Sequence, residues 1–168
     1  MRTREQISPF GILKVIVLSL GAAMAIPVHG EADPDAAAET ITIDRLEWAL
    51  ASNGEDIKWP EAVNYCAELS LAGHDDWRLP TLAELEGLHD PDGEGKEGIR
   101  SPFVIGDCCL WSGESLVDRP AADGDEIAGR PDMYHWGFMF DGGFPYYAVH
   151  LFDDGRALCT RDVGGAAE

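Results

Sequence analysis

A chain of 168 residues has room for one domain with its own hydrophobic core. It contains 31 Asp and Glu residues against 12 Lys and Arg residues, a formal net charge of −19 at pH 7. This surplus of acid argues against nucleic acid or an anionic membrane as partner, because both are bound by clustered Lys or Arg. It is compatible with a cation, with a basic partner, or with solubility alone.

Residues 1–30 have the pattern of a signal peptide. Arg2 and Arg4 form a positively charged start, Val15–Ala25 is a short apolar stretch, and small residues precede a cleavage site after Gly30. The apolar stretch falls short of the roughly 20 residues that span a bilayer. We expect a periplasmic or secreted protein with no stable membrane insertion after cleavage. The alternatives are an uncleaved N-terminal anchor and cleavage a few residues earlier, after Ala25.

The exported part holds an even number of cysteines: Cys66, Cys108, Cys109 and Cys159. In an oxidising compartment an even number favours disulfides, and four cysteines allow three connectivities.

The first half of the exported chain predicts two strands and two helices. After a flexible acidic segment at 31–39, the alternation of Ile41 and Ile43 indicates a strand, followed after a turn by a second short one. The stretch 59–72 has the apolar spacing of an amphipathic helix, with Pro60 in its first turn and Gly73 as its stop.

A second helix follows a short connection. Thr81 and Glu84 form a capping box, while Leu82, Leu85 and Leu88 supply an apolar face. The helix should end near residue 89, because the Gly-rich stretch beyond cannot continue it.

The second half of the chain is rich in loops and strands. Residues 110–112 indicate a brief buried strand, and 116–132 a long acidic loop. Three strands at 134–140, 146–152 and 157–161, separated by Asp-Gly turns, predict a meander. The order of elements predicts an α+β domain over 40–163, with a short tail at 164–168.

Several motifs occur in the order typical of one bacterial family. They are Leu46-Glu47-Trp48, Trp59-x-x-Ala62-x-x-Tyr65-Cys66, Trp77-Arg78-Leu79-Pro80-Thr81-x-x-Glu84-Leu85, Leu110-Trp111-Ser112-Gly113, Phe152-Asp153-Asp154-Gly155 and Cys159-Thr160-Arg161. Together they resemble the Lcl C-terminal domain family, named after the C-terminal domain of a collagen-like adhesin. The chain departs from the family pattern in the Cys108-Cys109 pair, in an acidic insertion at 118–132, and in Thr160 where a valine is common.

The resemblance implies a C-type-lectin-like fold, with paired terminal strands, two helices flanking a small antiparallel sheet, and a long loop region that presents the ligand surface. It also implies a disulfide between Cys66 and Cys159. If that bond forms, Cys108 and Cys109 join each other, remain free, or cross-link two chains. A bond between neighbours requires a strained ring, and two thiolates would instead suit Cu(I).

A calcium site is one interpretation of the Gly-rich loop that carries Asp90, Asp92, Glu94 and Glu97. The spacing lacks the distal glutamate of a full EF-hand loop, and a solvated loop is the alternative.

A ligand surface is expected where the acidic loop meets the aromatic strands. Its candidates are Asp118, Asp123, Asp125, Tyr134, Trp136 and Tyr146. Alternation along the strands places about half of the aromatics away from the core, where they could stack on a sugar or peptide; core packing is the alternative. By contrast, a structural role is expected for Trp77, Arg78, Pro80, Thr81, Glu84 and Trp111.

No common catalytic motif is present, so binding is favoured over catalysis. The first hypothesis is an exported binding module for a glycan or protein at the cell envelope, assisted by calcium or not. The alternatives are a copper enzyme like the formylglycine-generating oxidases, using a cysteine pair, and an acidic protein–protein interaction module.

Overall fold

The computed structural model describes residues 39–92, 98–122 and 129–164. The chain divides into two units, Met1–Ala36 and Ala37–Glu168, and all described residues belong to the second. The expected signal peptide, most of the acidic segment after it, and the last four residues of the tail lie outside the described residues. So do four candidate site residues: Glu94, Glu97, Asp123 and Asp125.

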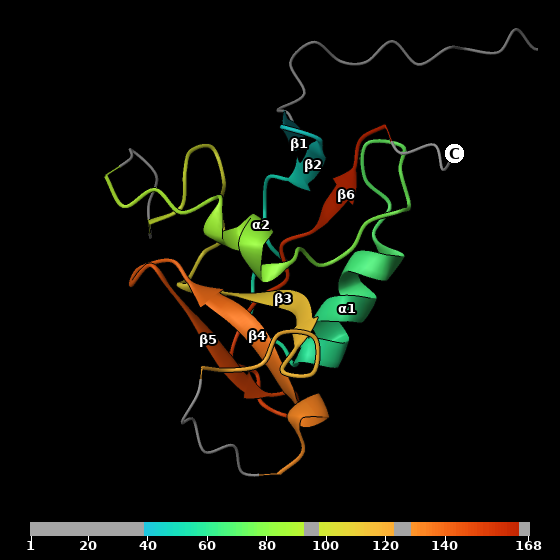
Figure 1. The fold of residues 1–168 in the computed structure, drawn as a ribbon. Coiled ribbons are helices and arrows are strands. Elements are labelled where there is room, and N and C mark those ends of the chain that lie inside the picture. The colour runs from blue at the N-terminus through green and yellow to red at the C-terminus, as the bar shows by residue number, and fades with distance from the viewer. Residues whose placement is uncertain (1–38, 93–97, 123–128, 165–168) are drawn as a thin grey trace, which may run out of the picture. The chain divides into compact units, whose positions relative to one another are not determined.

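The described fold is α+β (Figure 1). In chain order its helices and strands are β1 (Thr40–Ile43), β2 (Leu46–Ala49), α1 (Trp59–Glu68), α2 (Leu82–Glu86), β3 (Cys109–Ser115), the 3-10 turn η2 (Pro131–Met133), β4 (Tyr134–Met139), β5 (Phe144–Val149) and β6 (Thr160–Asp162). The strands form two antiparallel three-stranded sheets, ordered β1-β2-β6 and β3-β4-β5.

The first sheet joins the two ends of the described chain. Strands β1 and β2 form a tight hairpin in which Ile43 pairs with Leu46, and Asp44 in the turn has a φ of 56°. Strand β6 then pairs with β2, with Thr160 opposite Trp48. Pairing of strands from the two ends of the domain is what the family resemblance implied.

The prediction of a three-stranded C-terminal meander is wrong. Only β4 and β5 form a hairpin, and the next strand, β6, belongs to the other sheet. After β5 the chain crosses to the opposite edge of its sheet, where the Arg156 N–H donates to Cys109 O at 3.0 Å and Arg156 O accepts from the Trp111 N–H at 2.9 Å. The Asp153-Asp154-Gly155 turn therefore reverses the chain without pairing the flanking segments, because a turn motif does not specify a strand's partner.

The β4–β5 hairpin itself is confirmed. Its turn closes with a bond from the Gly143 N–H to Met139 O at 2.8 Å, and Gly143 has a φ of 70°. The imidazole of His89 lies so close to Gly143 that a Cβ there would be 2.5 Å from it, so glycine is required both for conformation and for space.

The two helices cover opposite faces of the β3-β4-β5 sheet. Neighbouring residues on a strand point to opposite faces, and Leu110 and Trp111 of β3 belong to different core clusters. Leu110 lies in the cluster that contains Leu82 and Leu85 of α2, whereas Trp111 packs in the cluster that contains Cys66 of α1. The sheet flanked by two helices is thus confirmed; the second small sheet was not predicted.

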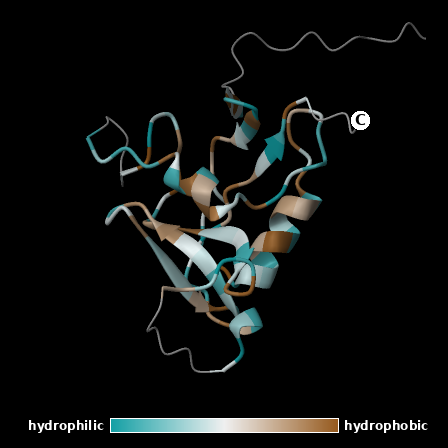
Figure 2. Ribbon diagram, in the orientation of Figure 1, coloured by the Kyte–Doolittle hydropathy of each residue, from teal (hydrophilic) through white to brown (hydrophobic). Residues whose placement is uncertain are grey.

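Helix α1 is amphipathic, as predicted, but shorter. Apolar and polar segments alternate along its ribbon (Figure 2), and Ala62 and Cys66 are fully buried. The helix ends at Glu68 rather than residue 72, because Leu69 is extended and the chain then turns through Ala72 and Gly73, whose φ values are 52° and 81°.

The capping box of α2 is confirmed. The Glu84 N–H donates to Thr81 Oγ1 at 3.2 Å, and the Thr81 N–H donates to Glu84 Oε2 at 2.7 Å. The helix is short, ending at Glu86, and its cap Gly87 keeps helical angles. The buried Leu82 and Leu85 anchor it on the sheet.

Candidate functional site

The W-R-L-P-T-x-x-E-L segment makes a structural network around Arg78. Its guanidinium donates to both carboxylate oxygens of Glu84 at 2.9 Å, and it also reaches Asp162 Oδ2 at 3.2 Å. Burial acts to raise the pKa of Glu84, but hydrogen bonds from Arg78 and Thr81 outweigh it and hold the pKa below its usual value. Arg78 thereby ties the start of α2 to β6.

The aromatic residues of the same motifs are buried and satisfied. The indole N–H of Trp77 donates to His74 O at 3.2 Å, and that of Trp111 donates to Ile57 O at 2.8 Å. Their exposed fractions are 3% and 0%, and Pro80 is also fully buried. The two indole N–H groups fix loop backbone through these hydrogen bonds, and the buried rings are not accessible to a ligand.

All four cysteines are oxidised. Cys66 of α1 bonds to Cys159, with Cα atoms 5.5 Å apart and 93 positions of chain between them. Cys108 bonds to its neighbour Cys109 at the start of β3, and no cysteine is free. A copper site at this pair would need two thiolates, so the disulfide would first have to be reduced.

The expected solvent-facing aromatics are packed, and the expectation that half of them face away from the core is wrong. Trp136 is 8% exposed and its indole N–H donates to Arg119 O at 2.6 Å. Tyr146 lies on the opposite face, where its hydroxyl donates to Asp154 O at 2.7 Å; burial raises its pKa. Both faces carry aromatics in the core because both faces are covered by helices.

Tyr134 is half-buried, with its ring edge-on to that of Tyr147 at 6.1 Å. It packs against the cluster that contains Trp136. Its contact with a ligand stays a prediction.

Of the acidic loop, Asp118 and Asp132 are described. The Asp118 carboxylate accepts from the Ser115 N–H at 2.9 Å and hydroxyl at 2.7 Å, and these bonds lower its pKa. Asp132 pairs with Arg130 at 3.3 Å. Both remain exposed on the surface.

The loop proposed for calcium closes like a hairpin at its base, where the Asp90 N–H donates to Gly98 O at 2.8 Å. Asp90 is half-buried and Asp92 exposed. Among the described residues no group of three or more His, Cys, Asp or Glu side chains is placed to hold a metal ion. The calcium site stays a prediction, since two of its four carboxylates lie outside the described residues.

Sequence reasoning missed a group of exposed apolar side chains, which we call the apolar end: Val117, Leu151 and Phe152. They are 62%, 59% and 57% exposed. All three lie at one end of the β3-β4-β5 sheet, where the Leu116 N–H donates to Tyr134 O at 3.0 Å and the His150 N–H donates to Met133 O at 2.9 Å. The apolar pattern predicts a strand over 146–152, which includes residues 151 and 152, but β5 ends at Val149.

Two histidines, His135 and His150, lie close together. The rings of His135 and His150 are 5.7 Å apart, and His135 also stacks on Trp59 at 3.5 Å. Burial, together with His150, lowers the pKa of His135 to about 4. His135 Nδ1 is buried without a hydrogen-bond partner in the described structure.

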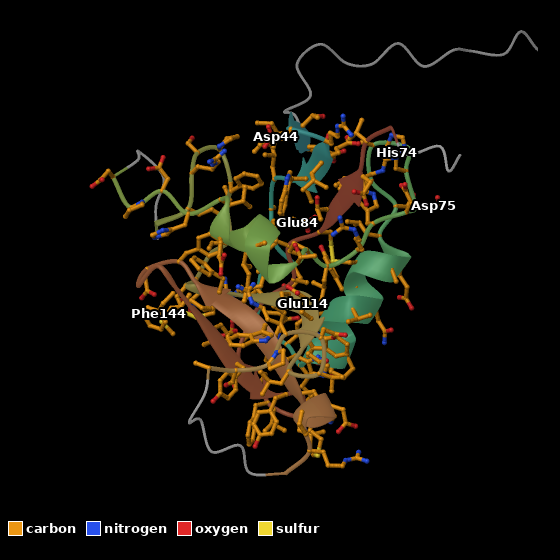
Figure 3. All side chains as sticks on the ribbon, viewed as in Figure 1. Asp44, His74, Asp75, Glu84, Glu114 and Phe144 are labelled. Atoms are coloured by element: carbon orange, nitrogen blue, oxygen red, sulfur yellow. A yellow bond between two sulfur atoms is a disulfide. The ribbon has the colours of Figure 1, made fainter. Side chains whose placement is uncertain are left out.

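A cavity of about 300 Å³ lies between the β1–β2 hairpin and α2. It is lined by Ile43, Asp44, Leu46, Trp48, Ala83, Glu84, Gly87, Leu88 and Arg100. Figure 3 labels Asp44, beside the β1–β2 hairpin, and Glu84, on α2. No sequence motif indicated this cavity, because its lining comes from three separate stretches of chain.

These features define a disulfide-braced α+β domain whose recurrent sequence motifs serve its scaffold. The chain belongs to the Lcl C-terminal domain family, whose model matches residues 41–160. No curated protein and no solved structure matches the chain at a stringent threshold of similarity. In the described ranges, no helix has the length and apolar character that crossing a membrane requires.

Proposed function

We propose that this protein is an exported, non-catalytic binding module with a C-type-lectin-like fold, and that it recognises a basic protein at the cell envelope through its apolar end. The exposed group of Val117, Leu151 and Phe152 is the observation that carries the proposal. Two disulfides support export, because such bonds persist in oxidising compartments.

The apolar end has the composition of a protein interface. Large apolar side chains seldom cluster on a solvated surface unless they meet a partner. Asp118, Asp153 and Asp154 are exposed and follow these side chains directly in the chain, so we expect their carboxylates to border the apolar end. With a net charge of −19, the molecule attracts a basic partner over a distance and orients it on approach.

A protein partner is favoured over a glycan by the placement of the aromatics. Sugar rings stack on exposed aromatic faces, but Trp136 is buried and Tyr146 packs under the sheet with its hydroxyl bonded. Phe152 offers an exposed ring at the apolar end, next in the chain to the aliphatic Leu151. A single ring among aliphatic side chains suits an apolar protein surface better than a sugar chain.

The fold proposal rests on two features of the architecture. Strands from the two ends of the domain pair in one sheet, and two helices cover opposite faces of the other. The proposal that calcium assists binding is based only on the carboxylates of the loop 90–97. It is independent of the proposed role of the apolar end.

The test measures binding of the full chain to two immobilised fractions from the producing cell, envelope proteins and envelope glycans. We expect binding to the protein fraction, weakening as salt is raised from about 50 to 500 mM because a rim of charge is screened. Leu151→Ser combined with Phe152→Ser should weaken binding at least about tenfold, since buried apolar anchors dominate interface energy.

Val104→Ser is the matched control. Val104 is also apolar and 66% exposed, but it lies in the loop before β3 rather than at the apolar end. Binding to the glycan fraction alone would contradict the proposal that the partner is a protein. If the control and the double variant weakened binding equally, the apolar end would not be the contact surface.

A further inference from the structure

The cavity between the β1–β2 hairpin and α2 has apolar walls and two charged side chains, Arg100 and Asp44, that make no ion pair with a described residue. Ile43, Leu46 and Trp48 of the hairpin face Leu88 and the start of α2 across a volume of about 300 Å³. This volume is at the lower end of the range for small-molecule sites, so the cavity suits a small ligand.

The charges in the cavity differ in their partners. Glu84 lines it, but its carboxylate is bonded to Arg78 and to the Thr81 N–H. Arg100 and Asp44 also line it, and neither makes an ion pair or side-chain hydrogen bond with a described residue. Arg100 is half-buried, whereas every other half-buried Arg in the described ranges is paired with a carboxylate.

We propose that this cavity binds a small zwitterion of the α-amino-acid type with an apolar side chain. The Arg100 guanidinium would hold the carboxylate, Asp44 the ammonium group, and the apolar wall the side chain. The site is separate from the apolar end, and its proposal does not depend on the protein partner.

A zwitterion fits better than a simple anion for an electrostatic reason. The whole chain carries a charge of −19, and Asp44 stands at the cavity itself, so a free anion would be repelled on approach. A neutral zwitterion meets no such barrier and still offers a carboxylate, which the planar guanidinium can bind through two hydrogen bonds.

The test uses L-leucine as probe on the full oxidised chain, by isothermal titration calorimetry and by the shift in melting temperature. Leucine should bind and raise the melting temperature, because a ligand of the folded state stabilises it. Arg100→Gln and Asp44→Asn should each raise Kd about 10- to 100-fold, the range expected when a charge-assisted hydrogen bond is lost. Asn tolerates the left-handed backbone at position 44, so the second variant keeps the turn.

Arg45→Gln is the matched control. It removes a charge next to Asp44 from an exposed side chain outside the cavity lining, and it should leave Kd unchanged. Leucinamide and isocaproate, which lack the carboxylate and the ammonium group respectively, should each bind at least about tenfold more weakly than leucine.

Three results would overturn the proposal. The first is that leucine does not bind to the folded chain. The second is that isocaproate binds as tightly as leucine, and the third is that Arg100→Gln and Asp44→Asn leave leucine binding unchanged. Circular dichroism of each variant establishes that the fold is retained, and Arg100→Lys, which keeps the charge but not the fork, should lie between the wild type and Arg100→Gln.

Discussion

His135 is an ionisable side chain in a place that disfavours its charge. It is 5% exposed, stacks on Trp59, and has a second imidazole, His150, 5.7 Å away. Asp118 and Asp132 act in the opposite sense, but burial and His150 prevail and lower the pKa to about 4. The folded domain therefore holds this imidazole neutral at pH values where a free histidine takes up a proton.

The stability of the domain should depend on pH through His135. Since its folded pKa lies below the ordinary value of 6.5, the unfolded chain takes up the proton first as pH falls. The contribution is complete above about pH 6.5 and is lost progressively toward pH 4, and by pH 5 the free energy of unfolding should have dropped by about 2 kcal/mol. Urea unfolding at pH 7 and pH 5 measures this difference.

His135→Phe should abolish most of that pH dependence, because phenylalanine can stack on Trp59 and cannot titrate. His74→Asn, a change at a histidine whose side chain is 43% exposed, should leave it in place. Equal stability of the wild type at the two pH values would contradict the buried neutral state of His135.

Arg78 and Glu84 form a bidentate ion pair, with two bonds of 2.9 Å. We expect Arg78→Gln to lower the free energy of unfolding by about 1 to 2 kcal/mol. The expected loss of stability is modest because the Arg78 side chain is 36% exposed, and solvent screens the ion pair.

A double-mutant cycle with Glu84→Gln isolates the pair from its other contacts. The two substitutions should be clearly non-additive, because each removes the same bidentate interaction. Additive effects would show that Arg78 acts through Asp162 and Leu79 O instead.

At the scale of elements, α2 is too short to be stable by its own hydrogen bonds. Its stability comes from the Thr81 cap at one end and from the burial of Leu82 and Leu85. Thr81→Ala should cost about 1 kcal/mol, whereas Thr81→Ser should cost little because serine caps equally well. Thermal unfolding of both variants checks this, and equal melting temperatures for the two would argue against the cap.

The elements that sequence predicted well are those with local signals. The capping box at Thr81 and the Asp-Gly turn before Gly143 specify their own geometry within a few residues. The stretch 157–161 was misassigned because its partner, β2, lies more than a hundred residues earlier and no local pattern identifies it. The length of α1 was overestimated because the apolar spacing continues past the point where Leu69 becomes extended.

The candidate site was harder to predict than the fold. Placement of Trp136 and Tyr146 depended on whether one or both faces of their sheet are covered, which alternation along a strand cannot decide. The apolar end and the cavity at Arg100 are assembled from segments distant in the chain, so neither has a sequence signature.

At the scale of the whole molecule, the two disulfides should contribute very differently to stability. The bond between Cys66 and Cys159 closes a loop with a separation of 93, and it restricts the unfolded chain strongly. Replacing both cysteines by serine should cost about 4 kcal/mol in the chain-entropy account. The bond between Cys108 and Cys109 joins neighbours and closes no chain loop, so its removal should cost far less.

Urea unfolding of the two double-serine variants under oxidising conditions measures this contrast. A larger loss from the Cys108-Cys109 variant than from the Cys66-Cys159 variant would contradict it. In that case the turn around residues 105–109, which the Arg156 bond to Ile105 O at 2.9 Å braces, would depend on its disulfide.

The described part of the domain is a disulfide-braced scaffold with exposed apolar side chains at one end of the β3-β4-β5 sheet. The Arg78 network and the Cys66–Cys159 bond join its sheets and helices, and the motifs of the family serve that scaffold.

Site-specific photo-crosslinking in the producing cell tests the proposed function most directly. A photoreactive residue at position 152 should give one discrete protein adduct, while the same residue at position 65, which is also exposed but lies on α1, should give none. An adduct at position 65 and not at 152, or equal diffuse labelling at both, would contradict the apolar end as the surface that binds a partner.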